Sequence, residues 1–157
     1  MGTVMANGIG IYYERTGGDK PPVVLCHGVR DSSRCWPRVE AALKSSDDVI
    51  RLDARDHGRS DAPEEGYGLD GLADDVAGVI AALGLKQPAV VGHSLGAMTA
   101  AELAGTYPDL VRCIVLEDPP WRYSEQTAEE WAALIDSFRA SAVALKAMTG
   151  EQMEKVP

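Results

Sequence analysis

The sequence predicts an α/β protein whose core is a doubly wound, mostly parallel β-sheet. Short apolar runs alternate along the chain with amphipathic stretches of helical spacing, which is the order in which such sheets are built. The pentapeptide Gly92-His93-Ser94-Leu95-Gly96 stands between one apolar run and one alanine-rich stretch, at a predicted strand–turn–helix junction. The 157 residues suffice for one domain with a sizeable core.

Six apolar runs predict the strands of this sheet. The first two are joined by Asn7-Gly8, a dipeptide that is typical of a tight hairpin turn. The six runs lie near Val4 and at Ile9 to Tyr13, Val23 to Cys26, Val49 to Leu52, Ala89 to Val91 and Arg112 to Glu117.

Three stretches have the spacing of amphipathic helices. An apolar stripe recurs from Leu69 to Leu83, and Gly84 follows as a stop signal. The alanine-rich stretch begins at Leu95 and ends at about Tyr107, before a proline. A third helix is predicted from residue 127, where Thr127 and Glu130 fit a capping box and an apolar stripe continues to residue 145.

The pentapeptide has the pattern of a nucleophile elbow, G-x-S-x-G. Glycine is expected at positions 92 and 96 because a side chain there would collide with the neighbouring strand or helix. The turn would hold the Ser94 hydroxyl at a helix N-terminus, where backbone N–H groups and the helix dipole favour developing negative charge. An incidental Gly/Ser turn is the alternative interpretation, and the flanking strand and helix argue against it.

Two further segments, His27-Gly28-Val29 with Trp36 and the stretch from Leu52 to Ser60, each follow a predicted strand. Together with the elbow they resemble the α/β-hydrolase family, in particular its compact esterases, C–C hydrolases and cofactor-free haloperoxidases. The resemblance spans about residues 3 to 120. One departure is Asp56, where relatives usually carry glycine, and it puts the geometry of that loop in question.

This resemblance implies an oxyanion hole formed by the backbone N–H groups of Val29 and Leu95. It also implies a catalytic triad in the chain order serine, acid, histidine, with Ser94 as the nucleophile. Asp118 is a candidate for the acid, together with Glu117, although a polar strand end that caps the next turn explains both equally well. No histidine follows Ser94, and neither His27, His57 nor His93 stands where a base is expected.

The family's sheet has eight strands, and this chain has candidates for six. We therefore expect a hydrolase-type sheet truncated after about the sixth strand, with residues 1–122 as the N-terminal part of the core. The helical segment 123–157 corresponds to the start of a lid, or to a helix that covers the shortened core. The sixth strand would then have an open edge, which predicts association with a C-terminal half or with a second copy.

Composition restricts the partners. The net charge of −9 and the pI of about 4.7 argue against nucleic acid and anionic membranes. No secretory signal or membrane-spanning run is evident, and Cys26, Cys35 and Cys113 fit small buried hydrophobes of a reducing compartment, so we expect a cytoplasmic protein. The residues offer no metal-ligand spacing, and neither metal nor cofactor is expected.

Two functions of different classes follow from these observations. The first is a serine hydrolase that acts on a small ester-like substrate and is incomplete as given, because no histidine follows Ser94. The second is a non-catalytic interaction module derived from a shortened hydrolase, in which the elbow is a relic.

Overall fold

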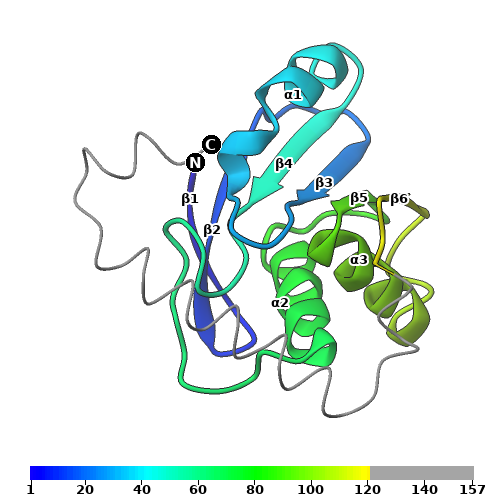
Figure 1. The fold of residues 1–157 in the computed structure, drawn as a ribbon. Helices are drawn as coiled ribbons and strands as arrows, with labels where there is room; N and C mark the ends of the chain where they lie inside the picture. The colour runs from blue at the N-terminus through cyan, green and yellow to red at the C-terminus, as the bar shows by residue number, and fades with distance from the viewer. Residues whose placement is uncertain (121–157) are drawn as a thin grey trace. The chain divides into compact units, whose positions relative to one another are not determined.

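The computed structural model describes residues 1–120, whose six strands form one sheet (Figure 1). The strands are β1 (Gly2–Ala6), β2 (Ile9–Arg15), β3 (Pro22–Cys26), β4 (Asp48–Leu52), β5 (Ala89–His93) and β6 (Cys113–Glu117). Their order across the sheet is β1-β2-β4-β3-β5-β6, in which β4, β3, β5 and β6 are parallel and the first two strands are antiparallel to their neighbours. The predicted doubly wound, mostly parallel sheet is confirmed.

The hairpin between β1 and β2 is the two-residue turn that the sequence predicts. Ala6 pairs with Ile9, and both intervening residues have positive φ, 47° at Asn7 and 81° at Gly8. This is the pattern of a type I′ turn, for which asparagine and glycine are the preferred residues.

Several strands extend beyond the apolar runs that predict them. β2 continues to Arg15, which pairs with Ile50 of β4, and β5 continues to His93, which pairs with Glu117 of β6. Pairing through the backbone does not require an apolar side chain, so a polar residue can lengthen a strand wherever its neighbour offers a partner. This extension places His93 and Ser94 at the very edge of the sheet.

Four helical segments accompany the sheet within residues 1–120. They are η1 (Ser33–Cys35), α1 (Pro37–Leu43), α2 (Leu69–Ala82) and α3 (Leu95–Thr106). The predictions for α2 and α3 are confirmed to within one residue. Gly84, the predicted stop signal, follows α2 and has a left-handed φ of 61°. The sequence interpretation missed α1, a seven-residue helix with proline in its first turn and no fully buried residue.

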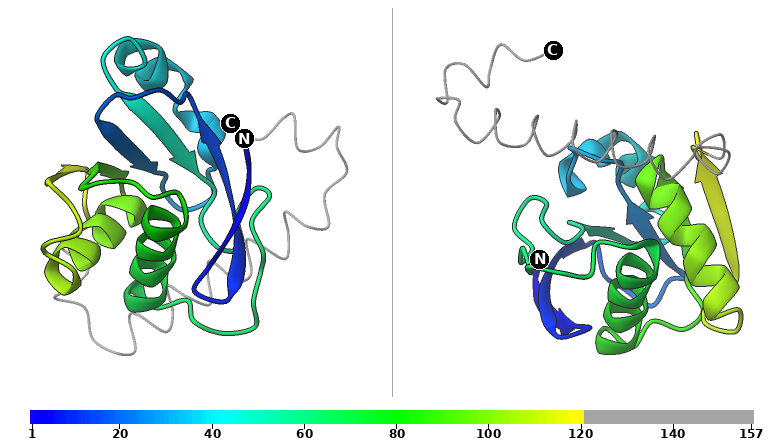
Figure 2. Two further views of the ribbon diagram at one scale, coloured as in Figure 1. Left: turned by 180° about the vertical axis from the view of Figure 1, so that it is seen from behind. Right: turned by 60° about the horizontal axis from the view of Figure 1, so that its bottom comes forward.

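The core has two parts, one on each face of the sheet. Val24 and Cys26 of β3 belong to the cluster that packs with α2 and α3, whereas Val23 and Leu25 belong to the cluster that packs with α1. This alternation follows from the two-residue period of a strand. Helices α2 and α3 lie side by side in the views of Figures 1 and 2. Trp36 is 4% exposed and packs within the α1 cluster.

The predicted lid segment, 123–157, and its helix from residue 127 lie outside the described residues, as does the end of the core segment 1–122. Within residues 1–120 no helix is both long enough and apolar enough to cross a membrane.

Candidate active site

Ser94 occupies a sharp turn between strand and helix. β5 ends at His93 and α3 begins at Leu95, so that Ser94 alone makes the turn, with φ of 51° and ψ of −113°. A residue other than glycine is strained in this conformation. The turn is held from outside by a hydrogen bond of 2.9 Å that the Ser94 N–H donates to the carbonyl of Glu117 at the end of β6.

The two glycines of the pentapeptide are required by close backbone approach. A Cβ atom on Gly92 would lie 2.1 Å from the carbonyl oxygen of Gly96. A Cβ atom on Gly96 would lie 2.1 Å from the carbonyl oxygen of Cys26 in β3. Both contacts are with backbone atoms, which cannot move aside as a flexible side chain can. The predicted steric reason for these glycines is confirmed.

A second tight turn, Gly28 to Asp31, lies beside Ser94. The Asp31 N–H donates to the Gly28 carbonyl at 3.3 Å, and Arg30 has a left-handed φ of 66°, which is the pattern of a type II turn. A Cβ atom on Gly28 would lie 3.3 Å from the Cβ of Ser94 and 2.9 Å from Nδ1 of His93. The predicted oxyanion segment is therefore adjacent to the predicted nucleophile.

The two predicted oxyanion donors have no competing acceptor in the part of the chain that the structure describes. Neither the N–H of Val29 nor the N–H of Leu95 is hydrogen-bonded there. Leu95 is the first residue of α3, where N–H groups lack acceptors within the helix. That the two N–H groups converge on one point remains a prediction.

His27 is buried at the end of β3, with 2% of its surface exposed. Its Nε2 accepts a hydrogen bond from the Ala54 N–H at 3.0 Å, and its Nδ1 lies 2.7 Å from the Gly28 carbonyl. Because a carbonyl only accepts, Nδ1 carries the proton. Burial lowers the pKa of His27, which keeps the ring neutral. Both nitrogens are engaged, so His27 is not available as a base.

His57 is engaged in the same manner. Its Nδ1 lies 2.8 Å from the carbonyl of Arg55 and therefore donates, and its Nε2 accepts from the Arg30 N–H at 3.4 Å. The rings of His27 and His57 are 5.0 Å apart between centroids. The sequence interpretation that His57 belongs to a loop and is not the base agrees with these contacts.

Asp53 organises the segment after β4. Its carboxylate is buried and accepts from the backbone N–H groups of Ser33 at 2.7 Å and Arg59 at 2.9 Å. Burial alone would raise the pKa of Asp53, but these hydrogen bonds outweigh burial, and the pKa lies below its ordinary value. The carboxylate is therefore a fixed anion that ties two loops together.

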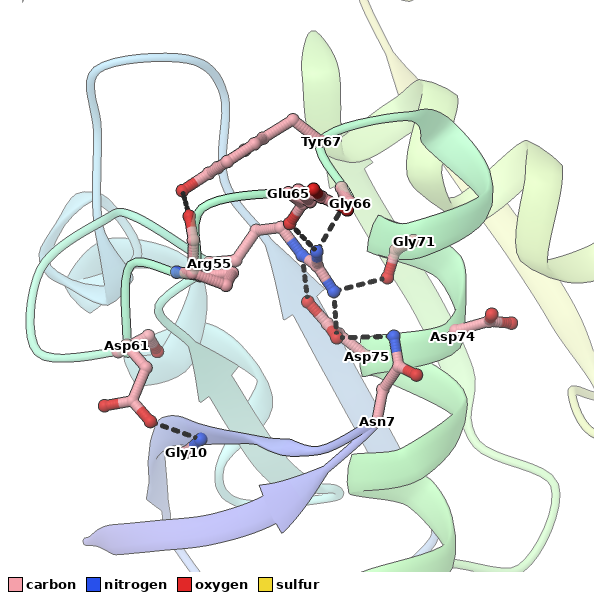
Figure 3. A network of polar contacts seen from close by, with 12 residues as sticks. Asn7, Gly10, Arg55, Asp61, Glu65, Gly66, Tyr67, Gly71, Asp74 and Asp75 are labelled. Atoms are coloured by element: carbon pink, nitrogen blue, oxygen red, sulfur yellow. Dashed lines mark hydrogen bonds and ion pairs between the residues drawn. The ribbon is translucent and has the colours of Figure 1, made fainter.

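A buried ion pair anchors the same segment to α2 (Figure 3). The Arg55 guanidinium donates to both carboxylate oxygens of Asp75, at 2.6 and 2.7 Å, and the two side chains are 4% and 5% exposed. It also donates to three backbone carbonyls, those of Glu65, Gly66 and Gly71. Asn7 of the β1–β2 turn donates to Asp75 at 3.2 Å.

Asp56, where the resemblance described above implies glycine, lies in the loop between these anchors. It adopts the left-handed φ of 59° that glycine favours, and its neighbour His57 donates its N–H to the Ala54 carbonyl at 3.0 Å. Aspartate tolerates this conformation better than most residues. The loop geometry that the substitution put in question is thus an ordinary turn.

Glu117 and Asp118 stand at the end of β6, beside the elbow. Both are exposed, and Asp118 has a left-handed φ of 47°. Glu117 pairs with His93 across the strands, which places these carboxylates on the same edge of the sheet as Ser94. Within residues 1–120 neither side chain has a hydrogen bond, so the choice between triad acid and polar strand end remains open.

A small apolar cavity lies behind the elbow. Leu95, Gly96 and Thr99 of α3 line it together with His27 and Val76, and its volume is about 30 Å³. That volume has room for about one or two water molecules. Among residues 1–120, no three His, Cys, Asp or Glu side chains are grouped closely enough to hold a metal ion.

Comparison with known proteins places these features in one family. Residues 21–149 match the family model described as alpha/beta hydrolase fold. The chain is 39% identical over 104 residues to a 2-(acetamidomethylene)succinate hydrolase of Mesorhizobium japonicum. This alignment covers 66% of the chain and 37% of that protein. It is 34% identical to an N-formylmaleamate deformylase of Pseudomonas putida, and this alignment covers 97% of the chain and 57% of that protein.

A solved structure gives the same result. The enol-lactonase of Burkholderia xenovorans superimposes with a TM-score of 0.69 at 30% identity, covering 71% of the chain and 44% of the enol-lactonase. The chain thus spans between about a third and somewhat more than half of the relatives it matches.

Proposed function

The chain belongs to the α/β-hydrolase fold family, and from this premise we propose that it is the nucleophile-bearing part of a serine hydrolase that cleaves esters or related acyl compounds. The observation that carries the proposal is the backbone of Ser94, a non-glycine residue with φ of 51° between two glycines that no other residue could replace. Such strain persists where the surrounding structure imposes it, and it is concentrated at functional sites.

In the proposed reaction the Ser94 oxygen attacks the acyl carbon while a base removes the hydroxyl proton. The carbonyl oxygen becomes an oxyanion, which accepts hydrogen bonds from the N–H groups of Val29 and Leu95. The bond to the leaving group then breaks, the leaving group takes the proton, and the acyl group stays on Ser94. Water, activated by the same base, releases the acid and restores the hydroxyl.

The base is proposed to come from residues beyond those described. His27 and His57 each use both ring nitrogens in hydrogen bonds to the backbone, and the ring of His93 lies against Gly28. No histidine follows Ser94 in the sequence. A second polypeptide segment that docks against the carboxyl edge of the sheet is therefore the proposed source of the base.

The substrate class is proposed from the chemistry that the names of three of the relatives share. A hydrolase of 2-(acetamidomethylene)succinate, an N-formylmaleamate deformylase and an enol-lactonase are named for cleavage of acyl compounds. We propose a small carboxylic ester, lactone or amide for this chain, without metal or cofactor. A non-catalytic module remains the competing proposal, because the backbone engages both nitrogens of His27 and of His57 and no histidine follows Ser94 in the sequence.

A fluorophosphonate probe tests the proposal, since it labels only activated serines. Labelling is measured on the chain alone and after addition of the separately expressed C-terminal part of the Pseudomonas putida deformylase. Labelling of Ser94 in either sample, abolished by Ser94→Ala, supports the hydrolase. Absence of labelling in both samples favours the non-catalytic module.

Val29 offers a sharper test of the oxyanion hole in a sample that reacts. Val29 occupies the second position of a type II turn, where proline is a favoured residue, so Val29→Pro removes the N–H while keeping the turn. The rate should fall by about a hundredfold or more, and Val29→Ala should retain it. Equal rates in the two variants would remove Val29 from the oxyanion hole.

A further inference from the structure

Two turns of the same kind face each other across the carboxyl ends of β3 and β4. The turn Gly28 to Asp31 follows β3, and the turn Ala54 to His57 follows β4. Each is closed by a hydrogen bond from its fourth N–H to its first carbonyl, and each has a left-handed residue in third position, Arg30 with φ of 66° and Asp56 with φ of 59°. The first of these turns contains Val29, the predicted oxyanion donor.

The two turns are linked by a reciprocal pair of histidines. His27 precedes the first turn and accepts the N–H of Ala54, the first residue of the second turn. His57 ends the second turn and accepts the N–H of Arg30 in the first. Each ring uses its other nitrogen to donate to a carbonyl within the turn on its own segment, that of Gly28 in the first turn for His27 and that of Arg55 in the second turn for His57.

The bond to Arg30 acts on the peptide that decides the type of turn. Types I and II differ in the orientation of the central peptide, which here joins Val29 to Arg30, and type II needs a positive φ at Arg30. That conformation is unfavourable for arginine by itself. An acceptor fixed on the N–H of Arg30 offsets this preference and disfavours the flipped peptide.

The acceptor is rigid because His57 is held from behind. Its Nδ1–H donates to the carbonyl of Arg55, and the Arg55 side chain is fixed on Asp75 of α2 and on the carbonyls of the loop that precedes α2 (Figure 3). A chain of contacts therefore runs from α2 through Arg55 and His57 to the Arg30 N–H. It ends one residue from Val29.

We propose that His57 is a positioning residue that holds the Gly28 to Asp31 turn, and with it the Val29 N–H, in the orientation of an oxyanion hole. That the turn serves as an oxyanion hole rests on the proposed function. That His57 holds the turn in place does not. A histidine whose Nε2 accepts from Arg30 cannot at the same time take the proton of Ser94, so positioning also excludes His57 as the base.

The test uses His57→Gln, His57→Asn and His57→Phe in the intact chain. A glutamine carboxamide is long enough to place its oxygen near the position of Nε2, where it would accept from the Arg30 N–H. The shorter asparagine reaches only the Arg55 carbonyl, and phenylalanine retains volume without either bond. Two readouts are measured, namely amide hydrogen exchange and chemical shift of Val29 and Arg30 by NMR, and the rate constant and half-saturating concentration of fluorophosphonate labelling.

We expect Arg30 amide exchange to be about fivefold faster in His57→Phe and His57→Asn, the factor for loss of one ordinary hydrogen bond. The Val29 amide resonance should shift in the same two variants, and His57→Gln should restore both signals. In a sample that reacts, the labelling rate constant should fall about tenfold in the two defective variants while half-saturation stays unchanged.

Unchanged exchange and an unchanged Val29 resonance in His57→Asn and His57→Phe would overturn the inference, as would equal labelling rates in all variants. The NMR result does not depend on catalysis. If the unaltered chain is labelled neither alone nor with the added C-terminal part, the proposed function fails while exchange and chemical shift still decide the role of His57. If His57→Phe does not fold, the pair His57→Asn and His57→Gln carries the same comparison.

Discussion

Asp75→Ala should destabilise the protein more than any other single loss of a carboxylate in residues 1–120. The substitution removes the two hydrogen bonds that the Arg55 guanidinium donates to Asp75 and the one that Asn7 donates to it. The guanidinium, which is 4% exposed, would keep only backbone carbonyls as partners for a full positive charge. Removing the counter-ion of a buried charge causes some of the largest losses of stability that a single substitution produces.

The expected loss is about 3–5 kcal/mol in the free energy of unfolding, the range for breaking one side of a buried ion pair. With a urea dependence of about 2 kcal/mol per molar, the midpoint should fall by about 1.5–2.5 M. Because the carbonyls of Glu65, Gly66 and Gly71 still contact the guanidinium, we expect the lower half of this range. Replacing both partners, Arg55→Met with Asp75→Leu, should cost less than Asp75→Ala alone.

Urea unfolding followed by circular dichroism and by tryptophan fluorescence, to which buried Trp36 contributes, measures the midpoint. The matched control is Asp74→Ala on the same helix, whose carboxylate accepts from the Tyr107 hydroxyl at the surface, and it should move the midpoint far less. A shift of equal size in Asp74→Ala and Asp75→Ala would refute the reasoning. A double variant less stable than Asp75→Ala would show that charge desolvation does not dominate the loss.

Three further predictions concern the elbow and the strand ends. Ser94→Gly should be more stable than Ser94→Ala by about 1 kcal/mol, because glycine adopts a φ of 51° without strain, and equal unfolding midpoints would argue against strain at this residue. Gly96→Ala should prevent folding or lower stability by more than about 4 kcal/mol because the added Cβ would collide with the Cys26 carbonyl. The control is Gly105→Ala in the same helix, which has open space around it and should stabilise the protein by about 0.5–1 kcal/mol. Similar unfolding midpoints for the two variants would contradict the steric argument. Burial lowers the pKa of His27 from 6.5, so the unfolded chain binds more protons just below that pH, and stability should fall as pH decreases from about 6.5 towards the folded-state pKa. His27→Gln should flatten that part of a pH series of urea midpoints, and an unaltered slope would assign it to another group.

The sequence was sufficient to predict the sheet and the elbow because both depend on local patterns. Apolar runs, the Asn7-Gly8 turn and the glycines at 92 and 96 are visible within a few residues of each other. Helix α1 escaped prediction because seven residues, about two turns, are too short to show a clear helical period. The proline at its start was the available signal.

The support of the site could not be predicted in the same way. Arg55 and Asp75 are twenty residues apart, and nothing in the sequence distinguishes this carboxylate from its neighbour Asp74, which faces Tyr107. The engagement of both nitrogens of His27 depends on where the turn after β4 lies relative to β3. Such contacts arise from the tertiary fold, and the sequence alone reveals only the loop motifs that contain them.

Backbone strain marks the same edge of the sheet that the motifs mark. Each of the four parallel strands is followed within four residues by a non-glycine residue of positive φ, namely Arg30 after β3, Asp56 after β4, Ser94 after β5 and Asp118 after β6. Such conformations cost on the order of 1–3 kcal/mol each, so their recurrence at one edge needs compensation. Backbone hydrogen bonds, the histidine pair and the buried Asp53 supply it. Glycine at any of these four positions would relieve the strain. Only at Ser94 would it also remove the hydroxyl on which the proposed function depends. A strained serine at that position therefore indicates function more strongly than the other three residues do.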